Sequence, residues 1–61
     1  MTPADLRTAR QSLDWSQQRL ADALGLTREF IGRMERGAKP IEKRTALAVE
    51  RLLDLHTPTA A

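Results

Sequence analysis

Residues 16–34 read SQQRLADALGLTREFIGRM, and the fold of the chain is organised around them. This stretch predicts two short helices joined by a tight turn. Leu20, Ala21 and Leu24 share one face of the first helix at the spacing of an α-helical repeat. Gly25 follows, and a glycine adopts the left-handed conformation that ends a helix without a Cβ clash. We therefore expect the first of these helices to end at Gly25.

Both helices begin with the same combination of residues. Ser16 and Thr27 are favourable N-caps, because a side-chain oxygen at this position accepts from a free N–H of the first turn. An apolar residue precedes each cap, Trp15 before Ser16 and Leu26 before Thr27. Each can pack on an apolar residue of the following helix as a hydrophobic staple, which fixes the angle at which the chain enters that helix.

Five positions stand at the spacing of a helix-turn-helix: Gln17, Ala21, Gly25, Ile31 and Met34. On these residues, and on the Glu35-Arg36-Gly37 that follows, the chain resembles the phage repressor and Cro-like family, also called the XRE family, from about Leu6 to about Leu53. The resemblance implies an all-α fold, a small lambda-repressor-like bundle of four or five helices. It also implies a transcriptional regulator, with repression as its expected role, whose third helix binds double-stranded DNA sequence-specifically in the major groove.

Two further helices are expected around this unit. The first extends to about residue 13, and three residues favour its first turn: Thr2, Pro3 and Asp5. The last extends from about residue 41 or 42 to about residue 55. We therefore expect one DNA-binding domain over residues 1–55 and a frayed tail over residues 56–61.

The composition limits the class of protein. A chain of 61 residues has room for one domain, and the absence of cysteine excludes disulfides and thiolate metal sites. No stretch approaches the roughly 20 apolar residues of a membrane span, and the signal-peptide pattern is missing, so we expect a cytoplasmic protein. The formal net charge is +2. Between Arg28 and Arg44, six basic residues stand against three acidic ones, and this excess favours an anionic partner.

Two charged residues fall on the apolar flanks of their helices. At about 100° per residue, Arg10 lies beside the apolar stripe of the first helix, and Glu35 lies beside Ile31 and Met34. A buried charge is costly unless it is paired, so we expect Arg10 and Glu35 to form a structural ion pair between the first and third helices. The family resemblance implies the same pair. Both residues are therefore left out of the expected DNA-binding surface.

The third helix carries the residues expected to read bases. Arg28, Glu29 and Arg33 lie away from its apolar edge, in the part of a recognition helix that reaches base edges. Arginine donates two hydrogen bonds to guanine, and glutamate accepts one from cytosine N4. Glu29 is open to two interpretations, because it either accepts from a cytosine or orients Arg33, its neighbour one turn along.

Phosphate contacts are expected around this helix, because amide side chains, cations and N–H groups at a helix N-terminus all bind phosphate oxygens. The residues expected to contact the DNA backbone are Gln17, Gln18, Thr27, Arg36, Lys39, Lys43 and Arg44. Such contacts position a protein without reading sequence. Gly32 has two interpretations: a bare surface that lets DNA approach closely, or a tolerated imperfection in the helix.

Apolar residues of the last helix fill more than one stripe, although a helix on a small domain needs only one stripe buried. The surplus favours a homodimer through this helix, with an interface formed by Val49, Leu52 and Leu53. A two-fold symmetric protein matches a palindromic DNA operator. The alternative is that the other three helices cover the whole width of the last one.

A second function class stays open, namely a helical protein-interaction module that keeps the helix-turn-helix fold without binding DNA. The acidic Glu29 on the expected reading face favours this alternative. An enzyme is disfavoured, because the single histidine, His56, stands near the end of the chain, and no metal-ligand set or phosphate-binding glycine loop is present. We therefore predict no catalytic residues, no metal, no cofactor and no small-molecule ligand.

Overall fold

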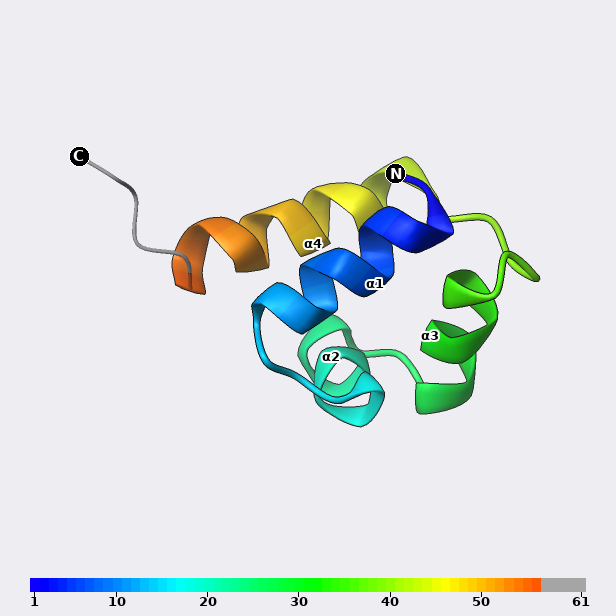
Figure 1. Cartoon of the computed structure of the whole chain (residues 1–61), viewed down its shortest axis with the longest axis horizontal. Helices are drawn as coiled ribbons and strands as arrows, with labels where there is room; N and C mark the ends of the chain where they lie inside the picture. Colours follow the sequence, from blue (N-terminus) through cyan, green and yellow to red (C-terminus); the bar gives the residue numbers. More distant parts are fainter. Residues whose placement is uncertain (57–61) are drawn as a thin grey trace.

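A computed structural model of the chain describes residues 1–56, which form four helices and no strand. The helices are α1 (Pro3–Ser12), α2 (Gln17–Leu24), α3 (Arg28–Glu35) and α4 (Lys43–His56). Helix α1 packs against α3 and α4, and α2 also packs against both α3 and α4 (Figure 1). The predicted all-α fold with a central helix-turn-helix is confirmed.

Helix α1 begins with a reciprocal cap. The hydroxyl of Thr2 accepts from the backbone N–H of Asp5, and the Asp5 carboxylate accepts from the backbone N–H of Thr2, each at 3.1 Å. Pro3 occupies the first turn, where its missing N–H has no intrahelical partner to lose. The hydrogen bond donated by the Thr2 backbone is the main cause that lowers the pKa of the exposed Asp5 carboxyl. The helix therefore starts where the sequence predicts.

The helix-turn-helix follows the predicted local chemistry. The Ser16 hydroxyl accepts from the N–H of Arg19 at 3.1 Å, and the Thr27 hydroxyl accepts from the N–H of Phe30 at 3.2 Å. Gly25 ends α2 in the left-handed region, with φ of 71°. The N–H of Leu26 then donates back into α2 at 2.8 Å, which closes the turn before α3 begins.

All four helices contribute to one hydrophobic core. Its largest fully buried side chains are Leu6, Leu20, Ile31, Met34 and Val49. Ala21 is also fully buried, and its small side chain lets α2 and α3 approach closely. Trp15 packs against this core, with the guanidinium of Arg19 4.9 Å from its ring and the His56 ring 5.2 Å away edge-on.

The burial of residues on α4 differs from part of the expected dimer interface. Val49 has no exposed surface, because it points into the core formed by the other helices, so the prediction that it contacts a second subunit was wrong. Leu52 and Leu53 are half-buried and pack on the same core. The large apolar side chains that α4 leaves exposed are those of Leu47, 55% exposed, and Leu55, 62% exposed.

Helix α4 extends to His56, and the rest of the expected tail, residues 57–61, lies outside the described residues. Within the described part of the chain, every helix is too short or too polar to cross a lipid bilayer.

Candidate nucleic-acid interface

The C-terminal end of α3 is held against α1 by a buried carboxylate. Glu35 is only 4% exposed, and its Oε2 lies 2.7 Å from Nε of Arg10. A second guanidinium nitrogen of Arg10 donates to Glu35 Oε1 at 3.2 Å, and a third donates to the backbone oxygen of Trp15 at 2.9 Å. Arg10 and Glu35, which the sequence analysis predicts to form an ion pair, are therefore in bidentate contact. Bidentate hydrogen bonding is the stronger geometry for an arginine–carboxylate pair.

Two more residues complete the surroundings of Glu35. Gln17 donates from its side-chain nitrogen to Glu35 Oε1 at 3.2 Å, and Arg7 donates to the Glu35 backbone oxygen at 3.2 Å. Burial raises the pKa of the Glu35 carboxyl, but the hydrogen bonds from Arg10 and Gln17, with the charges of Arg10 and Arg7, lower it by more. Glu35 is thus an ionised anchor that fixes α3 relative to α1 and the start of α2.

Sequence reasoning missed the role of Arg7. Its side chain is half-exposed, and besides its hydrogen bond its Nε lies 3.8 Å from Glu35 Oε1. Arg7 stands three residues before Arg10, so both fall on one flank of α1. This spacing could have predicted that a second cation of α1 lies near the end of α3.

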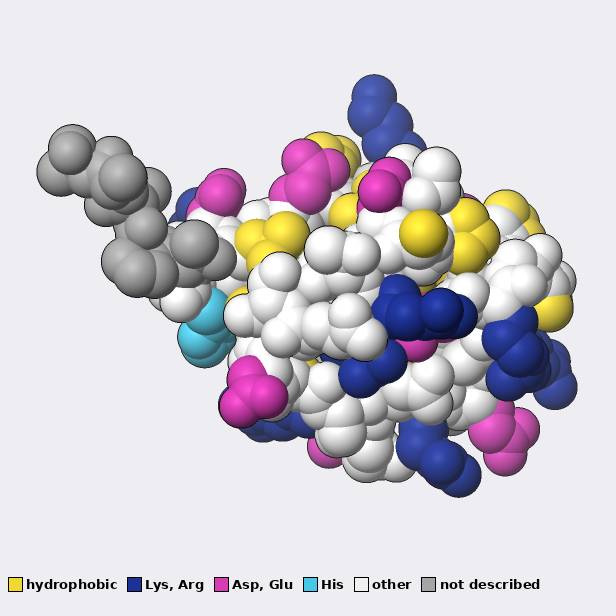
Figure 2. All heavy atoms as spheres, viewed as in Figure 1, with side chains coloured by type: hydrophobic (Ala, Val, Ile, Leu, Met, Phe, Trp, Pro, Cys, Tyr) yellow, Lys and Arg dark blue, Asp and Glu magenta, His cyan; other side chains and the backbone are white. Residues whose placement is uncertain are grey.

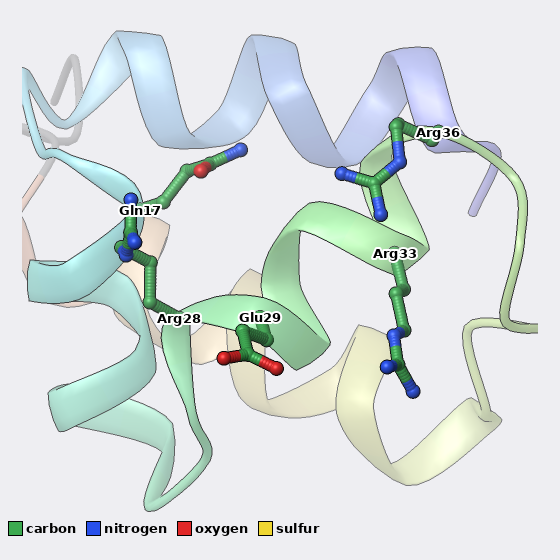
Figure 3. Close-up of a pocket in the computed structure, with 5 residues that line it drawn as sticks. All are labelled: Gln17, Arg28, Glu29, Arg33 and Arg36. Carbon is green, nitrogen blue, oxygen red and sulfur yellow. The ribbon is translucent and has the colours of Figure 1, made fainter.

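A concave pocket of about 230 Å³ lies beside this anchor. It is lined by Gln17, Arg28, Glu29, Arg33 and Arg36 (Figure 3). Helix α3 exposes its charged residues here because Ile31 and Met34 on its other side are fully buried. The pocket joins three arginines with one carboxylate, so it carries a net positive charge.

Gly32 lies beside two residues that line the pocket, Arg36 and Gln17. It is buried, and a Cβ at this position would lie 3.3 Å from Nη1 of Arg36 and 3.9 Å from the side-chain amide of Gln17. The guanidinium of Arg36 turns back over α3 toward the pocket (Figure 3). The missing side chain therefore makes room for Arg36 and Gln17, a third use of this glycine that the sequence did not indicate.

The predicted base-reading residues are brought together, since Arg28, Glu29 and Arg33 line the same pocket. Lys and Arg side chains gather around α3 in the space-filling view (Figure 2). Of the predicted phosphate contacts, the pocket includes Gln17 and Arg36. One N–H of the Gln17 side-chain amide is used by Glu35, which leaves its second N–H, its oxygen and its backbone N–H for other partners.

The other predicted phosphate contacts lie outside the pocket. Gln18 donates to Asp22 at 2.9 Å, and Thr27 caps α3. Lys39 is exposed in the loop after α3, and Lys43 begins α4. Arg44 lies 3.7 Å from Glu42 and lines a separate hollow between α2 and α4, so the structure does not place it with the arginines of α3.

Comparison with known protein families supports the helix-turn-helix fold. A family model described as helix-turn-helix matches residues 6–59, most of the chain. No curated protein and no solved structure matches. Among residues 1–56, no group of three or more His, Cys, Asp or Glu side chains is placed to hold a metal ion.

Proposed function

This chain belongs to the XRE and lambda-repressor-like helix-turn-helix family, and from that premise we propose that it is a sequence-specific regulator of transcription. Helix α3 enters the major groove of double-stranded DNA. The observation that supports this proposal is the exposed side of α3, where Arg28, Glu29 and Arg33 stand together on a helix whose opposite side is buried. A recognition helix reads base edges with such a surface.

The remaining cations position the protein on the duplex. Arg36 at the rim of the pocket and Lys39 in the following loop are exposed, so both are available to phosphate oxygens. The backbone N–H of Gln17 stands at the N-terminus of α2, where helix geometry favours an anion. The protein acts in the cytoplasm by occupying a promoter, and repression by exclusion of polymerase is the simplest outcome.

We propose a homodimer that binds a palindromic operator, with Leu52 and Leu53 of α4 at the interface and the exposed Leu55 in place of the buried Val49. Sedimentation equilibrium tests it. The wild-type protein is expected to form a dimer and Leu55→Lys a monomer with unchanged helix content. Leu47→Lys is the matched control, because Leu47 is similarly exposed but stands on another side of α4 from Leu52. A monomeric wild type would refute the dimer.

DNA binding is tested by fluorescence anisotropy on a duplex from upstream of the gene for this protein, compared with a scrambled duplex at several salt concentrations. Tight binding to the first duplex with a steep salt dependence is expected. Arg33→Glu should abolish binding, whereas Arg51→Glu, a matched reversal on exposed α4 surface, should preserve most of it. Absence of binding to both duplexes at low salt would favour the protein-interaction module instead.

A further inference from the structure

Glu29 is an isolated carboxylate among guanidinium groups. It lines the pocket with three arginines, yet within residues 1–56 the ion pairs shorter than 4.0 Å have only Glu35 and Glu42 as their acids. None of these ion pairs joins Glu29 to Arg33, and the charged ends of the two side chains stand well apart in the close-up (Figure 3). The interpretation that Glu29 serves to orient Arg33 is therefore not supported by the geometry.

A role in helix stability does not account for the location of Glu29 either. It lies in the first turn of α3, where a negative charge suits the helix dipole. Glutamine at the same position would preserve the helix, and Thr27 already caps it. A carboxylate on the surface that faces phosphates is repelled by DNA, so its presence needs a specific favourable contact.

The chemistry of base edges identifies that contact. A carboxylate only accepts hydrogen bonds. In the major groove, guanine presents two acceptors and thymine an acceptor with a methyl group, whereas cytosine presents only the N4 donor. Adenine presents one donor beside an acceptor, so it fits an isolated carboxylate less well than cytosine does.

Resting on the proposed function, we propose that Glu29 is a specificity determinant that selects cytosine in the operator and rejects guanine and thymine through repulsion between acceptors. The neighbouring guanidinium groups of Arg28 and Arg33 donate to guanine, the base edge that offers two acceptors. The half-site beneath α3 is therefore rich in G·C pairs. Arg28, Arg33 and Arg36 also supply the positive potential that keeps this carboxylate close to DNA.

The test compares three full-length proteins, wild type, Glu29→Gln and Glu50→Gln, in selections from a library of random DNA duplexes. Glu50 is an exposed acidic residue of α4 outside the pocket, so its variant controls for the loss of one negative charge. The wild type and Glu50→Gln should enrich the same G·C-rich motif. Glu29→Gln should lose the cytosine preference at one position or change it to adenine, because glutamine pairs with adenine N6 and N7.

Anisotropy titrations on the selected duplex then measure the discrimination. Replacing the selected cytosine by thymine or guanine should weaken wild-type binding about tenfold, and this ratio should fall toward one in Glu29→Gln. A Glu29→Gln protein that keeps the wild-type motif and ratio would overturn the role of Glu29 while DNA binding stands. A wild type that enriches no motif would overturn the proposed function and this inference together.

Discussion

At the scale of single residues, the stability of this protein depends strongly on how Glu35 is neutralised. Arg10→Ala leaves a carboxylate that is 4% exposed with only Gln17 and the half-exposed Arg7 as donors. Removing one partner of a buried pair costs about 3 kcal/mol. A domain of this size has a total stability of only about 3–9 kcal/mol, so urea unfolding should detect a large loss.

Arg44→Ala is the control for this experiment. Arg44 lies 3.7 Å from Glu42, and both side chains are mostly exposed. Ion pairs of this kind contribute about 0–1 kcal/mol, because water screens the charges. Equal losses of unfolding free energy in the two variants would mean that burial of the Arg10–Glu35 pair has no special importance.

The same carboxylate predicts a dependence of stability on acid. The pKa of Glu35 is lowered in the folded protein, whereas the unfolded chain has the ordinary value of 4.5. The unfolded state therefore takes up the proton first. The stabilisation is fully present above that ordinary value and is lost as the pH falls through the lower folded pKa. Thermal melting at a series of pH values should show a smaller decrease of the melting temperature at acidic pH for Glu35→Gln than for the wild type.

A second carboxyl provides the comparison. Hydrogen bonds with Thr2 also lower the pKa of Asp5, so it acts in the same direction, but Asp5 is exposed. Asp5→Asn should therefore retain most of the acid dependence that the wild type shows. If Asp5→Asn reduced the decrease of the melting temperature at acidic pH and Glu35→Gln did not, the assignment to Glu35 would be wrong.

At the scale of helices, two glycines should respond to alanine with opposite signs. Gly25 has φ of 71° and open space where a Cβ would stand, so Gly25→Ala has only a backbone penalty of about 1–2 kcal/mol. Gly32 is helical, and alanine there gains up to about 1 kcal/mol of helix propensity. A Cβ at Gly32 would lie 3.3 Å from the flexible end of Arg36, and the Arg36 side chain can move aside to make room for it. Thermal melting should show a lower midpoint for Gly25→Ala and an equal or higher midpoint for Gly32→Ala.

The helix starts and the turn were predictable from sequence because their chemistry is local. Ser16, Thr27 and Gly25 act on backbone groups within a few residues, so their roles follow from spacing. The contact of Arg10 with Glu35 followed from a charge on an apolar flank. The burial of Val49 and the occupation of Gln17 by Glu35 depend on which helix faces which, and that is set by packing between distant segments.

At the scale of the whole molecule, the arrangement of charge matters more than its sum. The net charge is only +2, yet the basic excess stands between residues 28 and 44, on α3 and the segment that leads into α4. Long-range attraction to DNA is therefore expected from this part of a nearly neutral protein. Such an arrangement orients the approach of the protein, and it makes the affinity sensitive to salt.

Salt dependence can accordingly separate phosphate-binding cations from the rest. Each phosphate contact contributes about 0.9 to the slope of log affinity against log salt. Lys39→Ala, in the loop after α3, should weaken binding to all duplexes alike and reduce this slope by about one. Arg51→Ala removes an exposed charge from α4, away from that loop, and should leave the slope unchanged. Anisotropy at four or more salt concentrations measures both slopes, and an equal reduction in the two variants would mean that net charge, rather than the surface around α3, determines binding.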